Sequence, residues 1–408
     1  MQYLAVFKNT SYQTFARILT SGSGFLISIL IARSFGAATY GDYIKITSFV
    51  TLFYLLSDFG INAIFLQRKD SQESFKHLLY LRLTIAAVLF VIANTIALAL
   101  PYSSNLGTGF SPFVKLGIQI FSLQLFIQSV LFSTSAIFQK KLRYDLWARS
   151  LGVGSLVSLL LVSIAVFYNQ SLHTVLLALV FSGLVSVGLA LLYAKEKILP
   201  VSFDIKISKD LVIASIPLGL MLVFNLIYFR IDSLILAVFR SSSDVGIYGL
   251  SYLFFDFLLA IPLFISNSIY PILLATKENK MEFLKLVKSY FLIYLGFSFM
   301  IVVPFWFSTP LFSAVKPELA GAIIPFRILL LSLPFFFLTS FLQWILITFK
   351  KTGFLLGVYF FLMCVNVILN FVFIPQYSYI ASAVITGICE IFIFIILSYK
   401  LIRLRYEK

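Results

Sequence analysis

The sequence contains little charge, little cysteine and little histidine. Only 12% of its 408 residues are charged, and it has 2 Cys and 2 His. Soluble domains carry about a quarter charged residues, so a soluble globular protein is excluded. Cys364 and Cys389 lie inside apolar runs, and His77 and His173 are far apart. The sequence therefore predicts no disulfide framework, no metal site and no histidine-based catalytic site.

Apolar residues are abundant instead, at 61% of the chain with a mean hydropathy of +1.02. A membrane-spanning helix needs roughly 20 apolar residues, and runs of that length recur along the whole sequence. The pattern predicts an all-α integral membrane protein with twelve transmembrane helices. The first run contains Arg17 and is followed by no small-residue cleavage site, so we expect a retained helix and not a signal peptide. The predicted spans are 11–33, 41–66, 80–100, 112–138, 149–168, 172–193, 211–238, 245–274, 289–309, 322–349, 352–374 and 379–402.

The positive charges follow the alternation of these spans. The chain has 31 Lys and Arg residues and a formal net charge of +15. With the N-terminus placed in the cytoplasm, most of them, Arg82 included, fall in inner loops or at the adjoining helix ends. Positive charge is retained on the cytoplasmic side, so we expect both termini there. The net charge reflects topology, and no nucleic-acid partner is needed to explain it.

Two short segments indicate an internal repeat. RSFGAATYGDY begins at Arg33 and RSSSDVGIY begins at Arg240, and each leads into a Gly-x-Tyr. Gly41 precedes Asn62 by the same interval as Gly246 precedes Asn267. These matches favour a duplication into two six-helix bundles, 1–200 and 201–408, related by an axis along the membrane normal. The alternative is shared loop chemistry without duplication.

In the first half, polar residues interrupt two predicted spans. Arg17 shares a helix face with small residues such as Gly24, which favours a cavity over the alternatives of a close helix contact or a side chain that extends to the interface. Asp58 and Asn62 share a face of the second span. A buried carboxylate needs a partner or a proton, so Asp58 is either a charge-balancing group or a structural hydrogen-bonding group.

In the second half, Asn225, Tyr228 and Asp232 fall on one face of a predicted span. Arg230 lies about 200° around the helix from Asp232, so the two cannot pair along one face. Each must find its counter-charge elsewhere, and Asp256 is on the next predicted span. The sequence leaves open whether Arg230 faces a cavity or extends to the outer interface.

The last predicted span contains Glu390 roughly 16 Å from its outer end, near the middle of the bilayer. Intramembrane carboxylates are expensive and often functional, so Glu390 is a candidate coupling group, with structural use as the alternative. Arg327 is its candidate partner. Asn366 and Asn370 form an i, i+4 pair that is typical of contacts between membrane helices.

Three segments carry a family resemblance: LIARSFGAATYGDYIKITSFVTLFYLLSDFGIN (30–62), PLGLMLVFNLIYFRIDSLILAVFRSSSDVGIYG (217–249) and NVILNFVFIPQYSYIASAVITGICE (366–390). Together they resemble the polysaccharide biosynthesis flippases, the Wzx-type members of the MOP superfamily, which also contains MATE exporters and lipid II flippases. The resemblance covers essentially the whole chain. One departure is IASAV (380–384), which lacks the glycine usual in that turn.

The resemblance implies a bacterial inner-membrane protein with two bundles around a central cavity. Such proteins move undecaprenyl-diphosphate-linked oligosaccharides from the cytoplasmic to the periplasmic leaflet by alternating access, without a cofactor or a resident metal, and with coupling to a proton or sodium gradient. A polysaccharide polymerase and a chain-length regulator are implied partners. The residues expected to bind substrate are Arg17, Asn62, Asn225, Tyr228 and Arg230, and those expected to balance charge or couple transport are Asp58, Asp232, Asp256 and Glu390.

Two alternatives remain at this point. A MATE-like exporter of small molecules or cations would share the fold. A multi-spanning polysaccharide polymerase would also contain many helices, but such an enzyme needs a sizeable outer loop with catalytic acids or arginines. The predicted outer segments, such as 102–112 and 308–321, are short and poor in acids. The sequence therefore predicts a transporter and assigns no residue a catalytic role.

Overall fold

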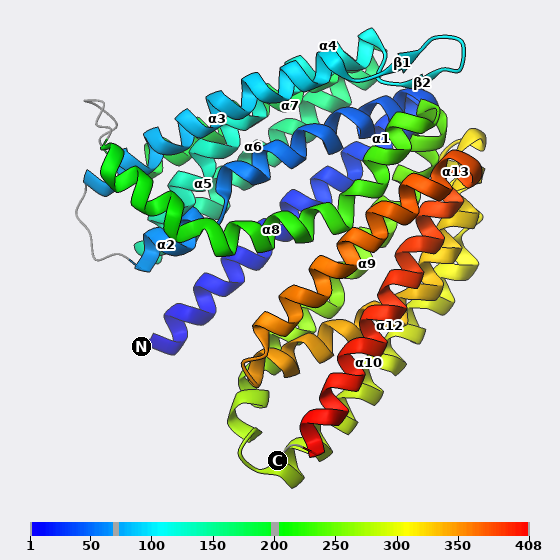
Figure 1. The fold of residues 1–408 in the computed structure, drawn as a ribbon. Coiled ribbons are helices and arrows are strands. Elements are labelled where there is room, and N and C mark those ends of the chain that lie inside the picture. The colour runs from blue at the N-terminus through cyan, green and yellow to red at the C-terminus, as the bar shows by residue number, and fades with distance from the viewer. Residues whose placement is uncertain (1, 68–72, 197–203, 407–408) are drawn as a thin grey trace. The chain divides into compact units, whose positions relative to one another are not determined.

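Helices make up nearly all of the computed structural model, which describes residues 2–67, 73–196 and 204–406. A helix satisfies its own backbone hydrogen bonds, which lipid cannot do, so a chain this apolar has little alternative. The elements are α1 (Gln2–Asp58), α2 (Ile61–Gln67), α3 (Glu73–Ala99), β1 (Tyr102–Ser103), β2 (Thr108–Gly109), α4 (Pro112–Phe121), α5 (Gln124–Lys140), α6 (Tyr144–Phe167), α7 (Leu172–Ala194), α8 (Ile205–Phe239), α9 (Ser242–Thr276), α10 (Lys280–Ser308), α11 (Leu311–Val315), a 3-10 helix (Pro317–Ala322), α12 (Ile323–Thr348) and α13 (Thr352–Tyr406) (Figure 1).

Ten helical segments within the described ranges are long and apolar enough to cross a bilayer. Two of them, Ala16–Gln67 and Thr352–Arg403, are 52 residues long, about twice the length that one crossing needs. A residue outside helical geometry divides each of them into two long parts, Gly36 in α1 and Ser378 in α13. Counted as two crossings each, they agree with the predicted twelve helices. The chain is a multi-pass, all-α membrane protein.

Side chains satisfy the backbone at both interruptions. Gly36 has φ 82°, a conformation that favours glycine, and the next amide, Ala37 N–H, donates to Glu318 Oε2 at 3.2 Å. At the α13 break, Arg240 donates from Nε to the carbonyl of Ile374 at 3.1 Å and from Nη2 to that of Pro375. Helix ends leave backbone groups without partners, and these contacts satisfy some of those groups at both interruptions.

Capping residues define several helix starts. The side chains of Ser111, Ser171 and Ser241 each accept a hydrogen bond from the backbone N–H three residues later, at the starts of α4, α7 and α9. Asn279 does the same for α10. A hydroxyl or amide oxygen at this position stabilises a helix start by ~1 kcal/mol. The short polar loops between the apolar runs therefore determine where the helices begin.

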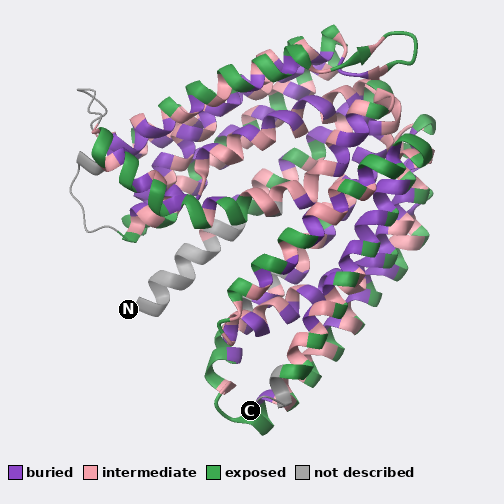
Figure 2. Cartoon of the chain, viewed as in Figure 1, coloured by how far each residue is buried: buried purple, intermediate pink, exposed green. Residues whose placement is uncertain are grey.

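The chain divides into two compact units, which are described separately below. The first contains Met1–Phe35 and Asp42–Val223, and the second contains Gly36–Gly41 and Phe224–Lys408. Helix α8 belongs to both, since the division falls within it. The first unit packs α3 and α7 against α5 and pairs α6 with α7, whereas the second is built around α12, which packs on α9, α10 and α13. Buried residues are dense along α12, while α10 presents exposed apolar residues such as Phe299 and Phe307 (Figure 2).

The repeated Gly-x-Tyr segments meet inside the second unit. A Cβ on Gly41 would lie 1.6 Å from the carbonyl oxygen of Ser242, and a Cβ on Gly246 would lie 2.0 Å from that of Ala37. The two glycines therefore occupy reciprocal positions at one backbone contact, which only a residue without a side chain allows. The loop similarity seen in the sequence corresponds to a direct contact between the two repeated segments.

Candidate functional site

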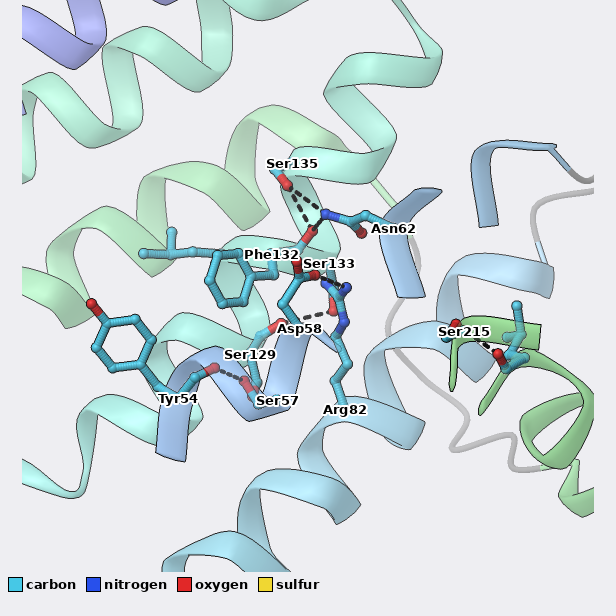
Figure 3. Close-up of polar contacts among 12 residues, drawn as sticks. Tyr54, Ser57, Asp58, Asn62, Arg82, Ser129, Phe132, Ser133, Ser135 and Ser215 are labelled. Carbon is cyan, nitrogen blue, oxygen red and sulfur yellow. Dashed lines mark hydrogen bonds and ion pairs between the residues drawn. The ribbon is translucent and has the colours of Figure 1, made fainter. Parts of the chain in front are cut away.

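Asp58, at the end of α1, pairs with Arg82 of α3 (Figure 3). Arg82 Nη2 lies 2.7 Å from Asp58 Oδ1, and the Arg82 side chain is fully buried, whereas that of Asp58 is 24% exposed. The guanidinium also lies over the ring of Phe132, 5.7 Å from its centroid. The expected partner for Asp58 exists, and it is Arg82.

The sequence counted Arg82 among the charges of inner loops and adjoining helix ends, and it did not predict that Arg82 is buried against Asp58. Helix α3 begins at Glu73, several residues before the predicted start of this span, and so carries Arg82 about 13 Å along its axis from the first residue. Two of its nitrogens, Nε and Nη1, have no hydrogen-bond partner. Arg82 is therefore a buried cation with one acidic partner and unused donors.

Asn62 lies beside this pair and connects two helices. Its Nδ2 donates to the carbonyl of Phe132 and to the hydroxyl of Ser135, both at 3.2 Å, so it attaches α2 to α5 (Figure 3). The Asn62 Oδ1 atom is buried and has no partner. Asn62 thus connects α2 to α5, and its side-chain oxygen remains available as an acceptor.

Arg17, unlike Arg82, has no acidic partner among the described residues. It lies in α1, its side chain is exposed, and it makes no ion pair with any residue that the structure describes. The carbonyl of Arg17 accepts from Thr20 one turn later, but its guanidinium retains its donors. An arginine at this position in an apolar helix is suited to an anionic group on a ligand.

Arg230 of α8 pairs with Asp256 of α9 in the second unit. Their Nη2 and Oδ2 atoms are 2.7 Å apart, and the two side chains are 37% and 34% exposed. Arg230 also lies over the ring of Tyr252 at 5.5 Å, and the Tyr252 hydroxyl donates to the carbonyl of Phe229. The prediction that Arg230 does not pair with Asp232 is confirmed. Because both partners remain a third exposed, a competing anion can reach Arg230.

Asp232 points instead toward the neighbouring tyrosine of the repeated segment. Tyr248 donates its hydroxyl proton to Asp232 Oδ2 at 2.5 Å, and the backbone N–H of Ser233 donates to Oδ1 at 2.7 Å. Asp232 is only 2% exposed. Two neutral donors therefore hold this carboxylate. Tyr248 was not among the predicted site residues, although its place in the Gly-x-Tyr repeat was a signal for it.

Glu390 of α13 has a similar environment. It is 3% exposed, its Oε2 accepts from Tyr228 at 3.2 Å, and its Oε1 accepts a short hydrogen bond from Thr339 of α12. Arg327, the expected partner, donates to the hydroxyl of Thr309 and lies over the Trp306 ring at 5.0 Å. Glu390 is thus held by neutral hydroxyls, because the described surroundings bring no cation to it.

The remaining predicted groups are partly placed. Asn370 Nδ2 donates to the carbonyl and side-chain oxygens of Asn366 within the same helix, and Asn366 Nδ2 reaches Cys389 Sγ at 3.9 Å. Asn225 belongs to α8, but its side chain lies outside the described residues. The predicted face of Asn225, Tyr228 and Asp232 therefore contributes two buried groups with separate partners.

These contacts supply two kinds of chemistry. Arg17 and Arg230 are accessible cations that can bind an anion, and Arg230 can exchange Asp256 for it. Asp232 and Glu390 are buried carboxylates held by hydrogen bonds, and buried carboxylates in membrane helices are often functional. Among the described residues no three His, Cys, Asp or Glu side chains converge in a way that could hold a metal ion.

Comparison with known proteins places this geometry in context. The family described as "Polysaccharide biosynthesis protein" matches residues 6–277. No curated protein matches the chain. Among solved structures, the chain is similar to the lipid II flippase MurJ in an inward closed conformation, with a TM-score of 0.76 and 16% identity over 97% of this chain and 87% of that one.

Two further structures are multidrug resistance MATE family transporters of the MOP superfamily. The inward-facing one gives a TM-score of 0.72 at 13% identity and covers 98% of this chain and 99% of its own. The outward-facing one gives 0.63 at 11% identity, covering 99% and 97%. At these identities the similarity establishes a common fold.

Proposed function

Because the chain belongs to the polysaccharide biosynthesis protein family, as the match over two thirds of its length shows, we propose that it is a flippase for lipid-linked oligosaccharides. In this proposal it moves an undecaprenyl-diphosphate-linked repeat unit from the cytoplasmic to the periplasmic leaflet of a bacterial inner membrane by alternating access. Surface polysaccharides such as O-antigen or capsule are the expected end products.

The observation that carries the proposal is that two accessible arginines lie on membrane-spanning helices, Arg17 in the first unit and Arg230 in the second. Arg17 has no acidic partner among the described residues, and Arg230 has one that is as exposed as itself. A diphosphate offers several acceptor oxygens, and guanidinium groups bind such oxygens through charge-assisted hydrogen bonds. A lipid diphosphate entering at this depth therefore finds its counter-charges in the protein.

Buried carboxylates supply the proposed coupling. Asp232 and Glu390 lie in the second unit, and neutral hydroxyls hold both. We propose that one of them exchanges a proton or a sodium ion during the cycle, so that the ion gradient drives the return of the empty protein. A polymerase and a chain-length regulator would receive the product at the outer leaflet. Both termini of the chain would lie in the cytoplasm.

The experiment is a complementation assay in cells that lack the endogenous flippase. Arg17→Ala and Arg230→Ala are expected to reduce surface polysaccharide by at least tenfold at normal protein level, since each removes a charge-assisted contact of ~2–3 kcal/mol. The matched control is Arg143→Ala, because Arg143 is 55% exposed and pairs only with Asp145 in a connection between helices. Wild-type display in both test variants would contradict a cationic substrate site at these positions.

The fold similarity to multidrug transporters supports one competing function, the export of small organic cations. A dye efflux assay on the same cells separates the two. The flippase proposal predicts no change in dye accumulation on expression of the protein. Efflux that depends on Asp232 or Glu390, with no restoration of surface polysaccharide, would favour the exporter.

A further inference from the structure

A second set of polar groups, none of them among the predicted site residues, surrounds a cavity inside the first unit. The cavity has a volume of about 360 Å³ and lies among α1, α5, α6 and α7. From α1 it receives Tyr43, Thr47, Thr51 and Tyr54, which share a helix face at spacings of four, four and three residues. Among the described residues that line it, none is Asp, Glu, Lys or Arg. It is therefore polar and uncharged.

The serines that line the cavity lie near the middle of two membrane-spanning helices. Ser155 and Ser158 line it from α6, and Ser182 and Ser186 line it from α7. Ser155 and Ser182 lie about 15–17 Å, and Ser158 and Ser186 about 21 Å, from the first residue of their helices, which is close to the middle of a helix that crosses the ~30 Å hydrocarbon core. Transporters commonly bind their substrates near the midplane. Hydroxyl groups at this depth need a polar partner, and a ligand or water can supply it.

The hydroxyls around the cavity offer mainly acceptor atoms. Ser155 donates to the carbonyl of Leu151 at 2.9 Å, and Thr47 donates to that of Tyr43 at 2.8 Å. Ser158, Ser182 and Ser186 likewise donate to carbonyls within their own helices. Each proton is thus occupied, while the oxygen lone pairs remain. A ligand with several hydroxyl protons would satisfy them.

Two amides add donors. Gln124 Nε2 donates to the carbonyl of Leu179 at 3.1 Å, and Gln128 Nε2 approaches Gln124 Oε1 at 3.5 Å. Each amide group carries a second N–H, and Gln128 also retains its own oxygen. The site therefore presents donors and acceptors together, beside the aromatic rings of Tyr43 and Phe121.

This chemistry selects the class of ligand. A charged group would lose its hydration without gaining a counter-charge, which is costly at membrane depth, and an apolar group would leave the hydroxyls and amides unpaired. A neutral molecule rich in hydroxyls avoids both costs. The volume equals that of roughly a dozen water molecules, enough for one or two sugar rings.

We propose that this cavity binds a sugar residue of the transported oligosaccharide through neutral hydrogen bonds. The inference rests on the proposed flippase function and adds a location and a chemistry to it. Thr20, another lining residue, lies one helical turn from Arg17 on α1. A diphosphate held by Arg17 thus has its attached sugar within reach of the cavity, so charge recognition and sugar recognition are neighbouring but separate.

The test compares two lipids bound to the purified full-length protein in detergent. One is undecaprenyl diphosphate without sugar, and the other is the lipid-linked oligosaccharide extracted from cells in which the protein is inactivated. Binding of each is measured by competition with a fluorescent prenyl diphosphate. The wild-type protein is expected to bind the sugar-bearing lipid at least tenfold more tightly.

Three variants alter the cavity while preserving shape to different degrees. Gln128→Leu and Thr51→Val remove polar atoms at nearly constant volume, and Ser155→Leu fills the space. All three are expected to weaken binding of the sugar-bearing lipid by roughly tenfold and to change binding of the sugar-free lipid by less than twofold. The matched control is Val153→Leu, which introduces leucine on the exposed face of the same helix. Arg17→Ala is expected to weaken both lipids.

The outcomes separate the two proposals. If the wild type binds both lipids equally, or if the well-folded variants Gln128→Leu and Thr51→Val leave the preference intact, the sugar site is wrong while the flippase function stands. If the wild type binds neither lipid, the proposed function fails and the sugar site fails with it. Should Ser155→Leu lower the melting temperature, the two isosteric variants still decide the question.

Discussion

The two units accommodate polar groups within membrane-spanning helices in different ways. The first buries a cation, Arg82, against a single carboxylate and surrounds a cavity with neutral hydroxyls and amides. The second buries two carboxylates, Asp232 and Glu390, and holds them with tyrosine and threonine hydroxyls. The same all-helical architecture thus lines a cavity with neutral groups in one unit and buries hydrogen-bonded carboxylates in the other.

The difference fits the two roles that we propose. Neutral groups would bind a sugar without depending on a gradient, whereas buried carboxylates can respond to protons or cations and so suit coupling. Substitutions can test this contrast, from the buried ion pair of the first unit to the partly exposed ion pair of the second.

The largest effect on stability is expected at the Arg82–Asp58 pair. Asp58→Asn leaves a fully buried guanidinium without the anionic partner it has among the described residues, and breaking a buried pair in this way costs ~3 kcal/mol or more. Thermal unfolding of the purified protein in detergent should show a clearly lower midpoint. The double variant Asp58→Leu with Arg82→Leu should recover most of the loss, and a double variant as unstable as Asp58→Asn would contradict this explanation.

A steric effect is expected next, at the glycine contact of the second unit. Gly41→Ala places a Cβ 1.6 Å from the carbonyl oxygen of Ser242, so the two segments must separate. Overpacking of this kind costs ~1–3 kcal/mol. Gly24→Ala is the control, because nothing lies within 4 Å of a Cβ there. Equal melting midpoints for the two alanine variants would show that the contact is not tight.

The third effect distinguishes the tyrosines of the second unit. Tyr248→Phe removes a hydrogen bond to the buried Asp232 carboxylate, which contributes ~1.5–3 kcal/mol when the acceptor is charged. Tyr252→Phe removes only a bond to the backbone carbonyl of Phe229, expected to contribute ~1 kcal/mol. Denaturation in detergent should therefore rank Tyr248→Phe as the less stable variant. The reverse order would indicate that the carboxylate has other donors.

The smallest effect on stability is expected for Arg230→Ala. The Arg230–Asp256 pair is about a third exposed on each side, and pairs of this kind contribute ~0–1 kcal/mol. The melting midpoint should change little, although the proposed function predicts a large loss of transport. A variant that melts much earlier than the wild type would show that Arg230 is a structural residue.

Periodicity predicted the helical part of this organisation well. The interruptions at Gly36 and Ser378 fall between predicted spans, and the 200° offset correctly separated Arg230 from Asp232. Both results rest on helix geometry, which depends only on residue spacing. The family assignment was also available from the sequence, because soft motifs in the right order are jointly specific.

Tertiary partners could not be predicted in the same way. The burial of Arg82 against Asp58 does not follow from its place near a predicted helix end, and Arg327, the candidate partner of Glu390, contacts Thr309 instead. The Gly-x-Tyr repeat pointed to Tyr248, but only the packing of the helices shows that Tyr248 and Thr339 contact the buried carboxylates. The neutral cavity was also hidden, since serine and threonine in membrane helices usually indicate close packing.

Reconstitution of the purified protein is the most direct test of whether accessible arginines bind a lipid diphosphate during its transfer across the membrane. Vesicles containing the purified protein would receive lipid-linked oligosaccharide in one leaflet, and its arrival in the other would be followed with an impermeant sugar-modifying reagent. We expect rapid transfer by the wild type and by Arg143→Ala, and at least tenfold slower transfer by Arg17→Ala and Arg230→Ala. Wild-type rates in both of these variants, or no transfer by any of the proteins, would contradict it.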